Sequence, residues 1–276
     1  MNIIIVKNQL MKKYILKATL ALAAIITITA CSNDNDEAIT GTGALTLEFD
    51  NAFKANDLIL TSQANTTANN EVLKISTVKY IVSNIVLTKE DGTTFTYPKS
   101  ESYFIIDEAT PASLEAQLKN IPAANYTKVK FGIGVDKAQW ELGATGQGDF
   151  LAKAQAAKMM WSWTAGYKFL AFEGTFTSST VTTPTSFMIH TGQTGTDYNY
   201  TEITLDLATK ALVRTNITPQ VHIITDISKV VDGTNTIKLT DNNMGAMGAM
   251  IMSGSKLALI TTNVNQMFKV DHVHND

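Results

Sequence analysis

The sequence predicts an all-β protein, a single antiparallel β-sandwich domain with two short helical excursions. From residue 44 onward, short runs of alternating apolar and polar residues are separated by clusters of Gly, Asn, Asp and Thr. Alternation with a period of two is typical of half-buried strands. About ten such runs, with little helical pattern between them, favour a sandwich or a barrel.

The first predicted strand covers residues 45–49, where Leu45, Leu47 and Phe49 share one face. Further strands are predicted in chain order at residues 79–88, 103–106, 128–135, 169–176, 187–190, 202–207, 220–225, 237–239 and 256–261. Residues 113–119 and 150–160 are rich in Ala, Leu, Lys and Gln and lack β-branched residues, so each is predicted to form a short helix. No Pro- or Gly-rich linker divides the body, and we expect one domain over residues 44–276.

The first 30 residues have the pattern of a secretory signal peptide. Lys12 and Lys13 precede an uncharged run that is too short to span a bilayer, and small residues follow at the expected cleavage site. Cys31, the single cysteine, comes directly after that site, where bacterial lipoproteins carry their lipid. We therefore predict a signal peptide over residues 1–30, a lipid anchor on Cys31 and a polar, acidic tether over residues 31–43. These features predict an outer-membrane lipoprotein that faces the periplasm or the cell surface.

The charge balance excludes nucleic acid as a partner. The first 30 residues hold four of the 22 basic residues and none of the 25 acidic ones, so the remainder is net acidic. Arg214 is the single arginine, and nucleic-acid binding usually recruits several such side chains to grip phosphates. The sequence also lacks Gly-x-Ser-x-Gly and His-Glu-x-x-His, so we predict that the protein is not an enzyme.

All four histidines lie in the last third of the chain, at His190, His222, His272 and His274. In an extended segment, His272 and His274 share one face and lie close enough to reach the same metal ion. His190 ends a predicted strand and His222 lies inside another, and for these two a structural, hydrogen-bonded role is the alternative.

Residues 267–270 alternate like a last strand, and its residues Phe268 and Val270 have the same parity as His272 and His274. The pair is therefore expected to point inward, where Asp136, Asp271 or a metal would be its partner. The alternative is a disordered, tag-like tail, because the pair lies close to Asp276.

Trp161 and Trp163 lie two residues apart, so in an extended segment they share a face. Core packing is one interpretation of this pair. The other interpretations are an aromatic platform for a sugar and a pair of tryptophans beside a metal.

Several short segments together resemble one known family. They are KYIVSNIVL at 79–87, FGIGVD at 131–136, MWSWTAGYKF at 160–169, FMIH at 187–190 and the ending MFKVDHVHN at 267–275. The chain resembles the MbnP-like domain, a periplasmic copper-binding family associated with methanobactin operons, and its ending is similar to that of lipid-anchored members from Bacteroidetes.

This resemblance implies a β-sandwich that binds one copper ion through histidines, beside a tryptophan that a haem-containing partner oxidises to kynurenine. It makes His190 the foremost ligand position and Trp161 or Trp163 the modified tryptophan. We predict a lipid-anchored copper-binding protein for uptake, storage or delivery. The alternative is a surface-exposed binding module for a glycan or protein, with Trp161, Trp163 and Tyr167 as its contact surface and structural histidines.

Overall fold

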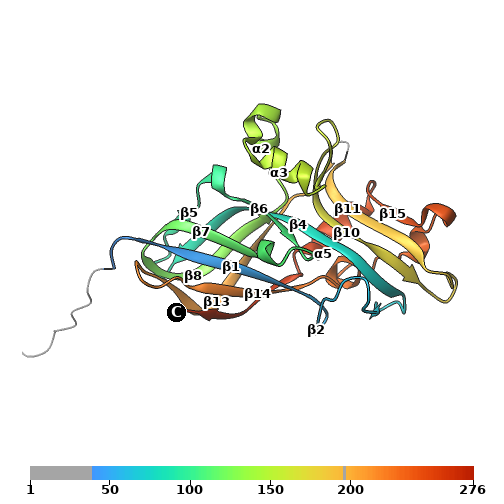
Figure 1. Ribbon diagram of the computed structural model, residues 1–276, viewed down its shortest axis with the longest axis horizontal. Helices are drawn as coiled ribbons and strands as arrows, with labels where there is room; N and C mark the ends of the chain where they lie inside the picture. Colours follow the sequence, from blue (N-terminus) through green and yellow to red (C-terminus); the bar gives the residue numbers. More distant parts are fainter. Residues whose placement is uncertain (1–38, 195–196) are drawn as a thin grey trace, which may run out of the picture. The chain divides into compact units, whose positions relative to one another are not determined.

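Two β-sheets packed face to face make up most of the structure (Figure 1). The computed structural model describes residues 39–194 and 197–276. The predicted signal peptide, Cys31 and the first part of the predicted tether lie outside the described residues. Residues 40–276 form one compact unit.

The smaller sheet has five strands within the described residues and runs in the order β16-β14-β1-β2, with β7 also paired to β1. Its central strand β1 pairs in parallel with β14 and antiparallel with β7 and β2. The strands are β1 (Thr42–Phe53), β2 (Asn56–Asp57), β7 (Glu115–Pro122), β14 (Gln220–Asp226) and β16 (Phe268–His274).

The larger sheet has eleven strands in the same part of the chain, with a main path β12-β11-β10-β4-β8-β13. Short strands extend it: β15 pairs with β11, β9 with β10, and β3, β5 and β6 with β4. The bounds are β3 (Asn65–Thr66), β4 (Val72–Lys89), β5 (Thr94–Thr96), β6 (Tyr103–Asp107), β8 (Ala124–Ile133), β9 (Met160–Ser162), β10 (Gly166–Thr177), β11 (Thr185–Thr194), β12 (Asp197–Tyr198), β13 (Thr201–Val213) and β15 (Ala249–Ile251).

Aromatic side chains from both sheets meet in the core between them. The ring of Phe49 on β1 lies edge-on to that of Phe131 on β8, with 5.6 Å between centroids, and Phe268 of β16 lies 5.2 Å from Phe131. Leu45 and Leu47 are fully buried beside Phe49. The alternation predicted at residues 45–49 therefore directs one face of β1 into the main core.

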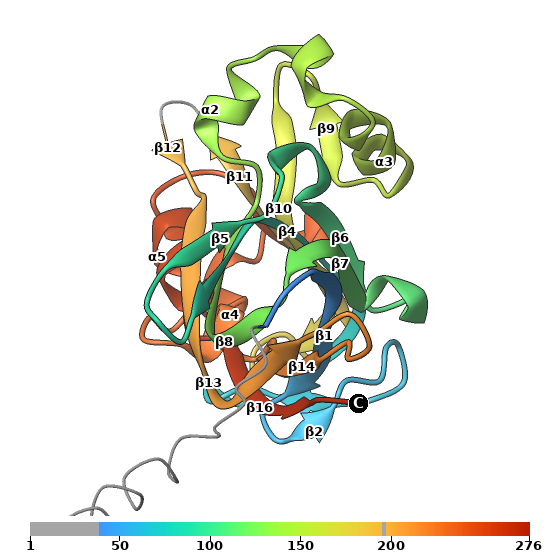
Figure 2. The ribbon, with the colours of Figure 1, turned by 90° about the vertical axis from the view of Figure 1, so that its left-hand side faces the viewer.

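A helical insertion after β8 covers a second, smaller apolar cluster, and Figure 2 shows its helices above the strands. Ile81 of β4 and Phe169 of β10 contribute to this cluster from the face opposite the main core. The insertion comprises α2 (Lys137–Trp140), the 3₁₀ turn η3 (Ala144–Gln147) and α3 (Phe150–Ala156). The other helical segments are η1 (Lys99–Glu101), η2 (Pro111–Ser113), α4 (Lys229–Asp232), η4 (Thr240–Asn242), η5 (Gly245–Met247) and α5 (Lys256–Val264).

The predicted fold class is confirmed: the described protein is mostly β, with two curled sheets and a few short helices. Two parallel pairs, β1 with β14 and β11 with β15, make the sheets mixed rather than purely antiparallel. The helix predicted at 150–160 corresponds to α3. Within the described residues, no helix is long and apolar enough to cross a membrane.

The helix predicted at 113–119 is wrong, because this segment enters β7 after the turn η2. Ala116 and Leu118 are buried while their neighbours are exposed. This alternation matches β1, with which Ala116 and Leu118 pair at Leu47 and Leu45. Burial against the neighbouring strand overrides the helix propensity of Ala, Leu and Gln.

Two predicted strands are also wrong. Residues 256–261 belong to helix α5, which buries Leu257, Ile260 and Val264 at helical spacing and leaves Leu259 43% exposed. Residues 237–239 form no strand, although Ile237 and Leu239 are buried. The backbone N–H of Leu239 donates to the Glu71 carboxylate instead of to a neighbouring strand.

Candidate metal centre

Three of the four histidines meet on the outer face of the smaller sheet. β14 and β16 are antiparallel neighbours in which His222 lies opposite His272, and Gln220 lies opposite His274. The rings of His222 and His272 have centroids 4.7 Å apart, and those of His272 and His274 are 4.4 Å apart. His272 Nε2 lies 2.8 Å from His274 Nε2.

A β-bulge places a carboxylate beside these rings. The register shifts between His222 and Ile223, so that Asp271 has no partner of its own on β14. An extra residue in one strand turns the following side chains to the other face. Asp271 and His272 are consequently both exposed, next to each other, although strict alternation would place them on opposite faces.

The bulge also corrects the predicted orientation of the histidine pair. Phe268 is buried, Val270 and Val273 are partly buried, and His272 and His274 are exposed. The pair therefore points outward rather than inward. The parity argument failed because it assumed an uninterrupted strand from residue 267 to the histidines.

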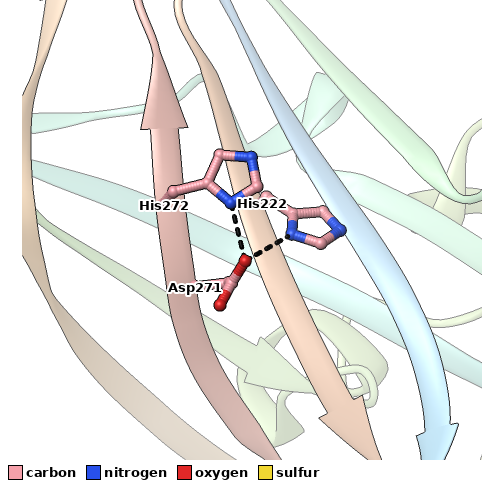
Figure 3. A group of neighbouring side chains, drawn as sticks. All are labelled: His222, Asp271 and His272. Atoms are coloured by element: carbon pink, nitrogen blue, oxygen red, sulfur yellow. Dashed lines mark hydrogen bonds and ion pairs between the residues drawn. The ribbon is translucent and has the colours of Figure 1, made fainter. Parts of the chain in front are cut away.

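The carboxylate of Asp271 lies between two imidazoles (Figure 3). Its Oδ2 is 2.7 Å from Nδ1 of His272 and 3.5 Å from Nδ1 of His222. The hydrogen bond with His272 lowers the pKa of Asp271 below its ordinary value. On the other side of His222, its Nε2 lies 3.3 Å from Oδ2 of Asp50 on β1.

These atoms can hold a metal ion. One ligand atom each from His222, Asp271 and His272 lies within 4.8 Å of the others. Metal bonds of about 2.0–2.2 Å place two ligand atoms no more than about 4.4 Å apart, so small side-chain rotations bring all three onto one ion. Two imidazoles and a carboxylate form a donor set that suits a transition-metal dication.

His190 occupies a different place, on β11 of the larger sheet. Figures 1 and 2 show β11 well away from the C-terminal strand. His190 is 3% exposed, and its Nε2 lies 2.7 Å from Oε1 of Glu173 on β10. This bond lowers the pKa of Glu173 below its ordinary value. The structure thus brings together His222, His272 and His274, while His190 pairs with Glu173.

The two tryptophans of the sequence WSW contact different partners. Trp161 lies beside His190, with ring centroids 5.9 Å apart and ring planes inclined by 53°. Trp163 lies in the turn after β9 and stacks on Trp140 of α2, with centroids 4.0 Å apart. They do not form one platform, and Tyr167, the third residue of the predicted contact surface, is 1% exposed.

Two acidic residues of these sites were not predicted as partners of histidine. Asp50 follows Phe49, so the alternation that directs Phe49 into the core already indicated that Asp50 lies on the outer face. Glu173 had no such signal, because its pairing with His190 depends on the register between β10 and β11. Asp136, which was considered as a histidine partner, instead forms an ion pair with Lys99, with an N–O distance of 2.8 Å.

No curated protein matches this chain. The solved structure described as MbnP from Methylosinus trichosporium is similar with a TM-score of 0.44 and 10% sequence identity, over 78% of this chain and 82% of that chain. The profile of the family described as MbnP matches residues 42–252, which is more than half of the sequence. The chain therefore belongs to the MbnP family.

Proposed function

We propose that this protein binds copper in the cell envelope, for uptake, storage or delivery, and that His222, Asp271 and His272 hold the ion. The observation that carries the proposal is the convergence of three ligand atoms from two neighbouring strands. Membership of a family that is associated with methanobactin copper-uptake systems supports copper as the cargo.

The donor set favours copper(II) at this site. Among divalent first-row metals, copper(II) binds nitrogen and oxygen ligands most tightly, and imidazole is one of its usual ligands. Nδ1 of His272 contacts Asp271, and such a carboxylate orients a ligating imidazole or supplies a ligand itself. His274, whose Nε2 contacts that of His272, would add a fourth donor next to the group.

The cellular setting of the proposal comes from the sequence. A lipid on Cys31 would attach the domain to the outer membrane through the acidic tether. A haem-containing partner that oxidises Trp161 or Trp163 is part of the same proposal. Trp161 is its preferred target because it lies against His190, whereas Trp163 stacks on Trp140. Peptide mapping of native protein by mass spectrometry tests for the modified tryptophan.

Copper(II) binding to purified mature protein tests the metal site. We would compare wild type with the double variant H222A/H272A by equilibrium dialysis and elemental analysis near pH 7.5. Wild type is expected to retain one copper(II) ion at this site and the variant to lose it, because two of the three donors are removed.

The control is Lys269→Ala, which changes an exposed side chain of the same strand β16 outside the group. This variant should bind copper(II) like wild type. Equal copper(II) binding by H222A/H272A and wild type would overturn the assignment of the site. Circular dichroism and thermal unfolding of all three proteins separate loss of ligands from loss of fold.

A further inference from the structure

A cavity of about 880 Å³ lies between the helical insertion and the segments η1, β6 and β7. Figure 2 shows α3 of the insertion above β6 and β7. Binding pockets for small ligands typically measure about 300–1,000 Å³. We propose that this cavity binds a neutral oligosaccharide. It shares no residue with the copper(II) site proposed above, so either proposal can fail without the other.

Aromatic and aliphatic side chains form one part of the cavity lining. Tyr103 of β6 and Phe150 of α3 both line the cavity, and their ring centroids lie 5.1 Å apart. Leu142 of the insertion also lines it and is 61% exposed. The C–H groups of a sugar ring pack well on such a surface, because the face of an aromatic ring is negatively polarised.

Polar side chains without partners form another part of the lining. Gln117 and Lys119 come from β7, whereas Asp149 and Lys153 come from the start and the middle of α3. In the described part of the chain, these four side chains form no hydrogen bond or ion pair with one another or with other residues. An ammonium donates hydrogen bonds, a carboxylate accepts them and an amide does both. A sugar hydroxyl also donates and accepts, so it is complementary to this mixed set.

The charges around the cavity balance. Its ionisable side chains of ordinary pH range are Lys99, Glu101, Lys119, Asp149 and Lys153. Lys99 forms an ion pair with Asp136, with an N–O distance of 2.8 Å. Three ammonium groups therefore face three carboxylates. Because binding sites complement the charge of their ligands, this balance favours a neutral ligand over an anion or a cation.

Hydrogen bonds between neighbouring elements hold the walls of the cavity in place. The hydroxyl of Tyr97 accepts from the backbone N–H of Lys119 on β7 at 3.2 Å and donates to Oε2 of Glu101 on η1 at 3.3 Å. Asp136, the N-cap of α2, accepts from the hydroxyl of Tyr103 on β6 at 3.1 Å. Walls that are already ordered lose little conformational freedom when a ligand binds.

This cavity differs from the aromatic surface that the sequence suggested for a glycan. Neither Trp161 nor Trp163 lines it. Tyr167 is 1% exposed, and its hydroxyl reaches only the lining residue Gln147, at 3.4 Å from Oε1. The proposed contacts with sugar come instead from β6, β7 and α3.

Isothermal titration calorimetry with defined probes tests the proposal. Purified mature protein would be titrated with the neutral sugars maltotetraose, cellotetraose and chitotetraose at millimolar concentration. Tetragalacturonate, an anion, and tetraalanine, a zwitterionic peptide, are the comparison probes. Wild type is expected to bind at least one neutral tetrasaccharide more tightly than either comparison probe. Failure to bind any of the neutral sugars, or tighter binding of a comparison probe, would overturn the proposal.

Paired substitutions assign the binding to this cavity. K119A/D149A removes one donor and one acceptor from opposite walls, and the affinity for the bound sugar should fall about ten-fold. K128A/D206A is the matched control, because Lys128 and Asp206 form an exposed pair of the same residue types outside the cavity.

The control K128A/D206A and the copper-site variant H222A/H272A should both bind the sugar within about two-fold of wild type. An unchanged affinity in K119A/D149A would contradict the assignment, and so would an equal loss in K128A/D206A. Lys119 and Asp149 are exposed, so their replacement should preserve the fold, and thermal unfolding of each variant checks this.

A second measurement locates the ligand directly. Gly146 and Gly148 line the cavity, whereas Gly92 and Gly254 lie elsewhere. The sugar would be added to protein that carries ¹⁵N-labelled glycine. The proposal expects the amide signals of Gly146 and Gly148 to shift and those of Gly92 and Gly254 to stay in place. An unchanged spectrum, or shifts confined to glycines outside the cavity, would contradict it.

Discussion

Glu173 and His190 join the two neighbouring strands β10 and β11 through a contact of 2.7 Å. The side chain of His190 is 4% exposed and that of Glu173 is 29% exposed. The hydrogen bond from His190 is the main reason why the pKa of Glu173 lies below its ordinary value. The folded protein therefore favours the ionised carboxylate.

In the variant Glu173→Gln, the free energy of unfolding should depend less on pH in the acidic range. A carboxyl group with a lowered pKa stabilises the folded state above its ordinary pKa of 4.5, and this contribution is lost as the pH falls through the folded-state pKa. Near neutral pH the variant should lose about 1–3 kcal/mol of unfolding free energy. That deficit should shrink below about pH 4.5.

Urea unfolding at a series of pH values measures this difference. Asp206→Asn is the control, because the Asp206 side chain is 79% exposed and pairs with Lys128 at the surface. Exposed ion pairs contribute little to stability, so the control should follow wild type across the series. A Glu173→Gln deficit of equal size at all pH values would show that charge is not its cause.

Asp271→Asn should weaken copper(II) binding at the His222 group. Asp271 contacts both His222 and His272, and its replacement removes the negative charge while keeping a similar shape. We expect about a ten-fold loss of affinity. Asp50→Asn serves as the comparison. Of His222, Asp271 and His272, Asp50 contacts only His222, so its replacement should lower the copper(II) affinity less. Isothermal titration calorimetry with copper(II) ranks the two variants, and the reverse ranking would contradict the assignment.

The copper(II) affinity of the His222 group should fall when the pH is lowered from about 7.5 to about 5. Imidazole binds metal only in its neutral form, and an ordinary imidazole titrates near pH 6.5. The pKa of Asp271 lies below its ordinary value, so this carboxylate stays ionised over the range. The loss is therefore attributable to the histidines. Dialysis at both pH values measures it, and equal copper(II) binding would exclude histidine ligation.

Alternation of apolar and polar residues made a strand predictable where one of its faces is apolar. Leu45, Leu47 and Phe49 are the example, and all three are fully buried. The same criterion was ambiguous for residues 256–261. Leu257 and Leu259 satisfy a period of two, while Leu257 and Ile260 satisfy the helical period. The structure buries Ile260 and exposes Leu259, so the helical period was the informative one.

The candidate site was predictable in its residues but not in its arrangement. His272 and His274 share a face, as their spacing predicted. The bulge at Asp271, which turns that face outward, depends on pairing with β14, about 50 residues earlier in the chain. Cross-strand register between distant segments leaves no local trace in the sequence. For the same reason, the separation of His190 from the other histidines became visible only in the structure.

Gly192→Ala should disturb the contact between Trp161 and His190. A Cβ atom at Gly192 would lie 2.4 Å from the carbonyl oxygen of Tyr167 and 3.0 Å from the Trp161 ring, so the backbone and the ring both have to move. Overpacking of this kind costs about 1–3 kcal/mol of unfolding free energy. Thermal unfolding should show the loss, and the displaced indole should change the tryptophan fluorescence.

The control for this prediction is Thr164→Ala, which changes an exposed side chain in the turn that follows β9. It should leave both stability and fluorescence close to those of wild type. Tryptophan fluorescence of the two variants is the decisive comparison. The emission should change in Gly192→Ala alone, because only this substitution displaces the Trp161 ring. An emission spectrum that stays unchanged in Gly192→Ala would mean that the ring keeps its place beside His190.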